Sequence, residues 1–588
     1  MTDKLSSAAM QKCLDDPRLT SYSTFLMTKI SFTSIVHHRR SRKILVIIVI
    51  ISLVVSAFFY SSQADNAVEI SYSIPATVAP NISVAEVLSV YTTTTVTSTV
   101  TSTTVDLVPL LVNDSSTVID QNMEEMESWN STNGYIVSAY YYENSKSLGA
   151  NALAIVMVLS QQSVPDLEKY QLTIISNSTN STLKSLATIK KETTTLTACE
   201  YVMTLVQSTV IHKPQSIAIE SHGVTVEIPF RKPRSFSHSP VIICIAPQFV
   251  AEKWQIFLMN IHIIRRYGGH MHVYITSMVD NLFNTLKVYE SWGSITMDYW
   301  VRMKFNETDD DGYTEPNGSV EWRNQAGAQT DCLLQYKEVA DYIAFFDIDD
   351  LLIPRYSHNY HQEFRSHFEA FPSYHSLFYT KRDVSVQKCS NITDFSMKRI
   401  FNTMIISDKT EYGKSVVDPL KYNSTWIHHS FRLPMNKKYR VRNTEIIHIK
   451  EILERELEKM PVDQIPRMWN TTDDPVVRGM DLNNLEQDFK EAHHNTQMRQ
   501  TAIHLIDHNF YLPIVFNCYN QSFYSPFFDE HKSFDVLCPN ADLCELPQRE
   551  DIKCIHSDAM YISGPQMHPI RFHYHINPFW SNNIGCYQ

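Results

Sequence analysis

The chain has 588 residues, which is too long for a single compact core and predicts two or more domains together with non-globular segments. Hydrophobic residues make up 43% of the sequence and aromatic residues 11%, enough for a sizeable core. The formal net charge of −12 argues against nucleic acid as a partner, because a phosphate backbone is bound by a concentrated positive face.

An uncharged apolar run from Ile44 to Tyr60 predicts a membrane-spanning helix. The run reaches about 25 Å at about 1.5 Å per residue, and such a short span suits the thinner membranes of the early secretory pathway. Four cationic residues lie within His37–Lys43, just before the run, and place the N-terminus in the cytosol. A cleaved signal peptide that ends near Ala64 is the alternative, but its apolar run would be unusually long.

We therefore expect a single-pass type II protein of the Golgi or secretory-pathway membrane, with a cytosolic tail (1–43), a signal anchor (44–60) and a luminal remainder. Asn-x-Ser/Thr acceptors for N-glycosylation occur repeatedly beyond the anchor. They are Asn81, Asn113, Asn130, Asn177, Asn180, Asn306, Asn317, Asn391, Asn423, Asn470 and Asn520.

Nine of the ten cysteines also follow the anchor, where an oxidising lumen favours disulfides. Because their number is odd, at least one must stay free or pair between chains. We expect Cys244, which lies inside an apolar strand-like run, to be a buried free thiol.

Composition divides the luminal part further. Residues 61–130 are rich in Ser, Thr and Val, which is typical of a solvated stem with many acceptors for O-glycosylation. Short alternating runs between 131 and 235 predict a β-rich subdomain to which no chemistry attaches. These runs are Tyr135–Tyr142, Ala152–Leu159, Gln171–Ile175 and Val224–Phe230. Residues 521–588 are expected to form a Cys-rich C-terminal extension.

Between 236 and 520, apolar strand-like runs alternate with helical patterns. The predicted strands are Val241–Ala246, Met271–Thr276, Ser294–Trp300 and Tyr342–Phe346, and the predicted helices begin near Trp254, Asn281 and Asn324. This alternation predicts an α/β domain whose parallel sheet is covered on both faces. Ligands of such sheets bind at the carboxyl ends of the strands, where Asp347 lies.

Asp347 and Asp349 follow a fully apolar strand in an i, i+2 pair. In extended backbone these side chains leave the same face, so both can approach one ion. Carboxylate oxygens suit Mg²⁺ or Mn²⁺, and such an ion can neutralise the diphosphate that leaves a nucleotide-sugar.

Two other interpretations of this pair are open. A solvated strand end is the commoner reason for an isolated Asp-x-Asp. A haloacid-dehalogenase-type phosphatase also ends a strand in this way, but it usually has Thr or Val where Leu351 stands, and its motif tends to follow the first strand of the domain.

Several motifs together resemble glycosyltransferase family 92. They are Ala246-Pro247, Trp254–Leu258, Asp331-Cys332-Leu333 and Phe346–Asp350 with Pro354, and the resemblance covers roughly residues 135–520. It implies a GT-A-like, Rossmann-type fold and an inverting transfer, galactose from UDP-galactose onto N-glycan core fucose being the best-known activity.

Carried over by position, the resemblance implies a metal site at Asp347 and Asp349 and donor-binding residues at Pro247, Gln248 and Asp331. Asp350 stands where the family usually has Glu, and it is our candidate for the catalytic base that an inverting transfer needs.

Two histidines complete the implied site. His428 ends a segment that looks like the family's Gly-Ile-His, with Trp426 in place of Gly, and is assigned to acceptor binding or another role at the site. His448 falls where the family commonly shows His-Tyr-Arg, and it is a candidate third metal ligand. A packed strand histidine is the alternative for His448, and His573 with His575 is a rival metal pair that surface histidines would equally explain.

The sequence thus predicts a metal-dependent inverting hexosyltransferase that uses Mn²⁺ or Mg²⁺, a UDP-sugar donor and a glycan acceptor on glycoproteins or glycolipids. The competing interpretation is a catalytically inactive glycan-binding or adhesion membrane protein on the same scaffold.

Overall fold

The computed structural model describes residues 132–161, 172–192, 198–305, 316–454, 477–507, 509–528 and 536–586, all within one compact unit. The predicted tail, anchor and stem lie outside these residues. Within the described part, no helix is both long and apolar enough to cross a membrane.

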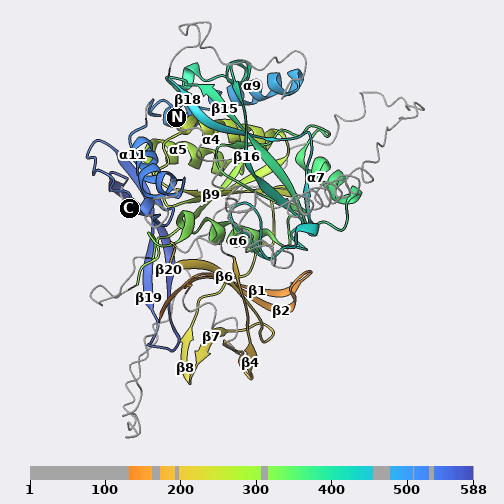
Figure 1. Cartoon of the computed structure of the whole chain (residues 1–588), viewed down its shortest axis with the longest axis vertical. Coiled ribbons are helices and arrows are strands. Elements are labelled where there is room, and N and C mark those ends of the chain that lie inside the picture. Colours follow the sequence, from red (N-terminus) through yellow and green to blue (C-terminus); the bar gives the residue numbers. More distant parts are fainter. Residues whose placement is uncertain are drawn as a thin grey trace, which may run out of the picture. The chain divides into compact units, whose positions relative to one another are not determined.

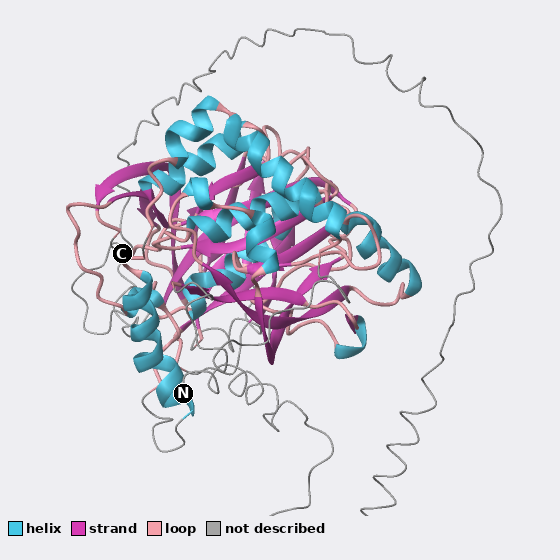
Figure 2. Cartoon of the chain, turned by 90° about the horizontal axis from the view of Figure 1, so that it is seen from above, coloured by secondary structure: helices cyan, strands magenta, loops and turns pink. Residues whose placement is uncertain are grey.

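Four parallel strands form one half of the largest sheet. They run in the order β12 (Ile295–Tyr299), β10 (Gly269–Ile275), β9 (Val241–Gln248) and β13 (Tyr342–Phe346), which confirms the strands predicted from apolar runs. Residues of β9 point alternately to two apolar cores. One core contains the helices α4 (Trp254–Arg266) and α5 (Asp280–Ser291), and the other contains α6 (Gln325–Tyr336), so helices cover both faces (Figure 2).

The other half of this sheet is largely antiparallel, so the prediction of a wholly parallel sheet is wrong and the fold is mixed α/β. The order continues from β13 through β16 (Ile405–Val417), β15 (Ser376–Gln387), β18 (Ile446–Leu453) and β14 (Asp350–Leu351), while β17 (Lys438–Arg440) pairs with β15. The exceptions in this half are the pairs β15–β18 and β15–β17, which are parallel. The physical reason is the connection: β15 and β16 follow each other in sequence and pair directly in opposite directions.

The N-terminal and C-terminal segments share a second sheet in the described residues. Its order is β11 (Ser277–Val279), β19 (Lys553–Ser563), β20 (Ile570–Ile584), β1 (Thr132–Ser145), β2 (Gly149–Ser160), β6 (Tyr201–Thr209) and β5 (Thr188–Glu192). Figure 1 shows β19 and β20 reaching β1, β2 and β6. The segment expected as an extension at 521–588 is therefore joined to the β-rich segment, and through β11 to the α/β segment.

A smaller sheet and several helices complete the described residues. The sheet has the order β4 (Thr182–Leu186), β3 (Thr173–Asn177), β7 (Ser216–Ser221) and β8 (Val224–Glu227). The remaining helices are α7 (Tyr360–Ala370), α8 (Met397–Asn402), α9 (Gly479–His494), α10 (Thr496–Ala502), α11 (Leu512–Tyr519), the π-helical turn η8 (Asn520–Tyr524) and α12 (Ser525–Phe528).

Two residues singled out in the sequence have surroundings that were not expected. Asn317 is only 6% exposed, and its side-chain amide exchanges two hydrogen bonds with the backbone of Met303, so this predicted glycosylation acceptor lies below the surface. Cys244 is not free: it faces α6 from β9 and forms a disulfide with Cys332. The other disulfides join Cys199 to Cys538, Cys518 to Cys544 and Cys554 to Cys586, and among the described cysteines Cys389 is free and buried.

These pairings predict the outcome of alkylation without reductant. When the full-length chain is unfolded in denaturant, we expect Cys389 to be the one labelled cysteine beyond residue 60, because the other eight are held as disulfides. Peptide mass spectrometry would detect the label. Labelling of Cys244 in the unreduced protein would contradict the structure.

Candidate functional site

The carboxylates after β13 lie in a turn rather than on an extended strand. The strand ends at Phe346, and the backbone N–H of Asp350 donates to the carbonyl of Asp347 at 3.1 Å. The predicted i, i+2 geometry, in which Asp347 and Asp349 leave one face of a strand, is therefore wrong. The turn gives each carboxylate a different set of partners.

Asp347 is held by two lysines from the antiparallel half of the sheet. Its oxygens accept from Nζ of Lys381 at 3.0 Å, from Nζ of Lys414 at 3.0 Å and from Nε2 of Gln325 at 2.9 Å. Burial opposes ionisation of this carboxylate. The charges of Lys414 and Lys381 outweigh burial and hold the pKa of Asp347 well below its usual range.

Asp350 is fully buried next to the same lysine. Nζ of Lys381 lies 2.7 Å from Oδ1 of Asp350, and the backbone N–H of Asp347 donates to Oδ2 at 3.0 Å. Burial raises the pKa of Asp350, although Lys381 opposes the rise. Because the carboxylate is fully buried beside Lys381, this geometry does not support the predicted role of Asp350 as the base that meets an acceptor hydroxyl.

His448 stands between two sets of carboxylates. It lies opposite Asp350 across the β14–β18 pairing. Its Nδ1 is 2.9 Å from Oδ1 of Asp383 and 3.5 Å from Oε2 of Glu411, while its Nε2 is 3.7 Å from Oδ2 of Asp349.

The charge state of His448 follows from these neighbours. Burial and the charge of Lys381 disfavour the protonated ring. The carboxylates of Asp349 and Asp383 outweigh both effects, so the pKa of His448 lies above its ordinary value.

One ligand atom each from Asp349, Asp350 and His448 lies within 4.8 Å of the others, and the same holds for Asp383, Glu411 and His448. Among the described residues, Asp347 belongs to neither group, and Asp350 joins Asp349 and His448 instead, so Asp347 stays a predicted metal ligand that this geometry does not bring into the group.

The set Asp349, Asp350 and His448 fits a divalent cation. Carboxylate oxygens and an imidazole nitrogen are ligands that Mn²⁺ accepts. Asp383 holds Nδ1 of His448, which leaves Nε2 directed at Asp349, and metal-bound histidines commonly have this carboxylate support.

The three residues predicted to bind the donor lie on two different elements, the end of β9 and the buried helix α6. Pro247 and Gln248 form the carboxyl end of β9, and Nε2 of Gln248 donates to the carbonyl of Ala246 at 2.7 Å. Asp331 lies within α6 and is 2% exposed.

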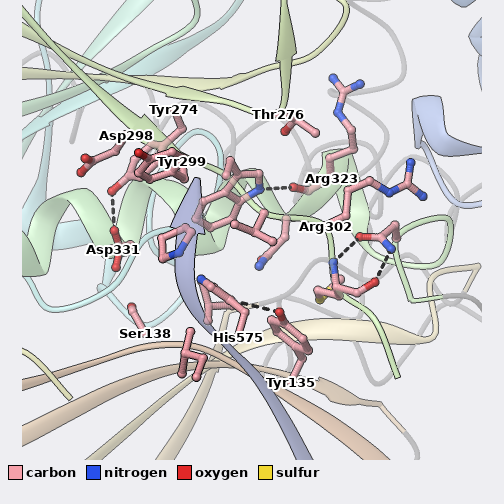
Figure 3. Close-up of a pocket in the computed structure, with 18 of the residues that line it drawn as sticks. Tyr135, Ser138, Tyr274, Thr276, Asp298, Tyr299, Arg302, Arg323, Asp331 and His575 are labelled. Carbon is pink, nitrogen blue, oxygen red and sulfur yellow. Dashed lines mark hydrogen bonds between the residues drawn. The ribbon is translucent and has the colours of Figure 1, made fainter. Parts of the chain in front are cut away.

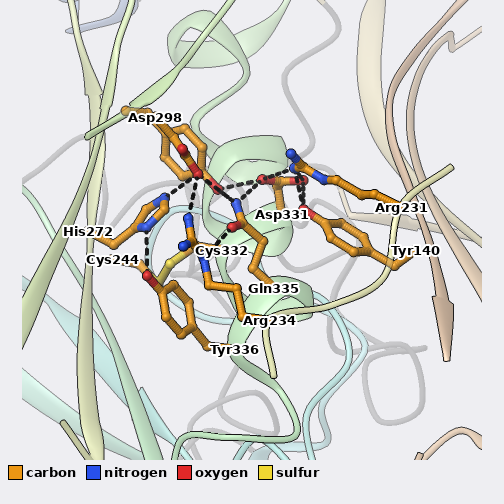
Figure 4. The surroundings of a disulfide bond; sticks show 11 residues. Tyr140, Arg231, Arg234, Cys244, His272, Asp298, Asp331, Cys332, Gln335 and Tyr336 are labelled. Atoms are coloured by element: carbon orange, nitrogen blue, oxygen red, sulfur yellow. Dashed lines mark hydrogen bonds and ion pairs between the residues drawn. A yellow bond between two sulfur atoms is a disulfide. The ribbon is translucent and has the colours of Figure 1, made fainter. Parts of the chain in front are cut away.

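A buried polar network surrounds Asp331 beside the Cys244–Cys332 disulfide (Figure 4). Its carboxylate accepts from the hydroxyl groups of Tyr140 at 2.7 Å and Tyr274 at 2.5 Å, and from Arg231 at 3.2 Å. Burial opposes its ionisation, but Arg231 and these hydrogen bonds bring the pKa of Asp331 to about 2. This network joins β1 to β10 and α6.

The predicted histidines have different surroundings. Nδ1 of His428 bonds to the carbonyl of Gly413 at 2.7 Å, whereas its buried Nε2 has no partner among the described residues. Burial and Lys414 place the pKa of His428 well below its ordinary value, so the ring is neutral.

His573 bonds to Ser563 and Asn133, and His575 bonds to Tyr135. Neither of these two joins a potential metal group in the described part of the chain.

The charged residues of β15 and β16 that meet at the site were not predicted from the sequence. Lys381 and Asp383 alternate along β15, while Glu411 and Lys414 lie on β16. The available signal was the pair of opposite charges at Lys381 and Asp383, which leave the same face of one strand, because buried charges need partners.

A cavity of about 460 Å³ adjoins the carboxyl ends of β10 and β12 (Figure 3). Tyr274, Thr276, Trp300, Arg302 and Arg323 line it together with β1 and β20. Asp347, Asp349 and Asp350 do not line it. The cavity and the carboxylate group meet at the start of α6, where Asn324 borders the cavity and Gln325 contacts Asp347.

The geometry predicts that Asp383 acts on metal binding through His448. In Asp383→Asn, the amide no longer supplies a negative charge and can donate to Nδ1, which would put the proton on Nε2. We expect about 10- to 100-fold weaker Mn²⁺ binding by titration calorimetry, with the folded state retained. The matched control is Asp408→Asn, an exposed position on β16. Equal affinity in Asp383→Asn and the control would contradict this role.

The comparisons with known proteins agree with one another. The family model for glycosyltransferase family 92 matches residues 239–493. The Caenorhabditis elegans protein "Glycosyltransferase family 92 protein ZK381.2" is 41% identical over 483 residues, covering 81% of this chain and 93% of that protein. The C. elegans protein "Glycosyltransferase family 92 protein F55C10.4" is 36% identical and covers 80% and 93%, respectively.

Among solved structures, S. aureus TarS 1-349 in complex with UDP-GlcNAc is 13% identical to this chain. The match covers 39% of this chain and 62% of that one, with a TM-score of 0.18. This likeness is too low to carry an argument.

Proposed function

This chain belongs to glycosyltransferase family 92, and on that premise we propose that it transfers a hexose from a nucleotide-sugar to a glycan. Galactose from UDP-galactose is the donor group we propose, from the resemblance of the motifs around Asp347. The acceptor is a glycan on a glycoprotein or glycolipid, and the fold we propose for the catalytic part is GT-A-like with inversion at the transferred sugar.

The observation that carries the proposal is the group of Asp349, Asp350 and His448 at the carboxyl end of β13. These three residues would hold Mn²⁺ or Mg²⁺. When bound, the ion supplies positive charge that stabilises the departing diphosphate.

The chain's own residues preorganise this group. Asp383 fixes the orientation of His448, so that Nε2 faces Asp349. Nζ of Lys381 lies 2.7 Å from Oδ1 of Asp350, and its charge opposes the rise in pKa that burial causes in that carboxylate. Lys414 and Lys381 engage Asp347, so its role is to hold the lysines and the turn in place.

Neutral His428 offers a hydrogen-bond acceptor close to these lysines. Its Nδ1–H donates to Gly413, so the lone pair of Nε2 is available to a substrate hydroxyl. We propose that His428 contacts the acceptor or the transferred sugar. This position is linked to the lysines because Nζ of Lys414 donates to the carbonyl of Ile427 at 3.0 Å.

We also propose a single-pass type II location in the Golgi or another secretory compartment. The support is the apolar run at 44–60 with its preceding cations, and the disulfides of the described residues, which form in an oxidising lumen.

The direct test is Mn²⁺-dependent turnover of UDP-galactose by the purified full-length chain on fucosylated glycan acceptors. We expect product that is abolished by EDTA and reduced at least ~100-fold in Asp349→Ala and in His448→Ala, since each removes a proposed ligand of the charge-stabilising ion. Asp408→Asn serves as the exposed control.

Each alternative has its own readout. Product from UDP-glucose or UDP-N-acetylglucosamine alone would replace galactose as the donor sugar. If the folded protein forms no product and binds no nucleotide, the transferase proposal fails, and glycan binding without catalysis takes its place.

A further inference from the structure

Three consecutive residues before α6 have left-handed backbone. Trp322, Arg323 and Asn324 have φ values of 48°, 53° and 57°, and none of them is glycine. This region is unfavourable for L-residues because Cβ approaches the following carbonyl oxygen. A run of three such residues therefore stores strain at one place.

Contacts from distant segments hold this turn. The backbone N–H of Trp322 donates to Pro539 at 2.9 Å, and Nε1 of Trp300 donates to the carbonyl of Arg323 at 3.1 Å. The Asn324 side chain caps α6 by accepting from the N–H of Gly327 at 3.1 Å. Strain that the surroundings maintain in this way is concentrated at ligand sites, which motivates a search for the ligand here.

The side chain of Arg323, in the middle of this turn, has an unusual environment. Its Cζ lies 3.7 Å from the centroid of the Phe249 ring, and its Nε and Nη1 are buried without a hydrogen-bond partner. No carboxylate of the described residues forms an ion pair with it, although the structure pairs Arg302 with Asp542 at 2.7 Å nearby. The charge of Asp542 reaches Arg323, but two buried N–H donors of the guanidinium stay without an acceptor, and an anionic ligand would supply one.

The same turn lies where a ligand of this fold would bind. Phe249 follows the end of β9, Thr276 follows β10, and Trp300 follows β12. Open α/β sheets bind ligands at this edge. Arg323 and Thr276 line the cavity of about 460 Å³, at the opposite side from Ser138 and Tyr135 in the view of Figure 3.

We propose that Arg323 is an anion-binding residue that contacts a phosphate group of the donor nucleotide. The planar fork of a guanidinium suits two phosphate oxygens at once. The identity of the nucleotide rests on the proposed function, whereas the anion-binding role rests on the unpaired guanidinium, the strained turn and the cavity.

The test compares Arg323→Gln and Arg323→Lys with the wild-type full-length chain by calorimetric titration of UDP, uridine and inorganic pyrophosphate. We expect Arg323→Gln to lose about 10- to 100-fold in affinity for UDP and pyrophosphate and to bind uridine as the wild type does. Arg323→Lys keeps the charge without the fork and should lie between the two. The control is Arg365→Gln, an exposed position on α7.

Thermal denaturation adds a measurement that a structural role would move differently. Since the substitution removes buried N–H donors that have no acceptor, Arg323→Gln without ligand should melt no lower than the wild type. Pyrophosphate should raise the melting temperature of the wild type more than that of the variant. A variant that melts well below the wild type would overturn the proposal in favour of a packing role over Phe249.

The remaining outcomes separate the two proposals. Sugar transfer with UDP affinity unchanged in both Arg323 variants overturns the role of Arg323 and leaves the transferase standing. Equal loss of UDP and uridine overturns the phosphate contact. If the wild type neither transfers sugar nor binds UDP, yet binds pyrophosphate through Arg323, the transferase and the donor assignment fail, and the anion comes from another source such as the acceptor.

Discussion

The ion pairs of Asp347 with Lys381 and Lys414 are the interaction on which the arrangement of the site depends. Asp347 directly follows β13, the last in chain order of the four neighbouring parallel strands, whereas the lysines come from β15 and β16 in the largely antiparallel half of the sheet. Because a buried charge without a partner is expensive, each of the three side chains restricts where the other two can lie. The two halves of the sheet are thereby locked together at the edge where the proposed chemistry takes place.

These ion pairs also give the neighbouring carboxylates different roles. Asp347 is occupied by lysines, so the ligand group that we propose consists of Asp349, Asp350 and His448. Asp383 is occupied by the other nitrogen of His448 and serves to orient the ring. An acidic triplet that looks uniform in sequence thus contains three carboxylates in three environments, which differ in burial and in the cations that they meet.

A feature of the structure can be predicted from the sequence when it depends on neighbouring residues, and not when it depends on contacts between distant segments. β9 and β13 are predictable because strands buried on both faces are continuous apolar runs. The meeting of Lys381 with Asp347 is not, because it depends on the register between strands far apart in the chain. The Cys244 disulfide fails for a related reason: whether Cys244 faces α6 or α4 depends on strand alternation relative to helices that the sequence does not place.

The pairing of β20 with β1 has a consequence for how the protein matures. β1 begins the described part of the chain and β20 ends it, so the sheet of β1, β2 and β6 keeps an open edge until the last strand has been synthesised. An unpaired strand edge is a template for other chains, and such long-range closure is intrinsically slow. The nascent protein therefore exposes this strand edge until β20 has been made. A premature stop before residue 570 would leave Asp349, Asp350 and His448 in place on a chain that lacks one wall of the cavity and whose N-terminal sheet cannot close.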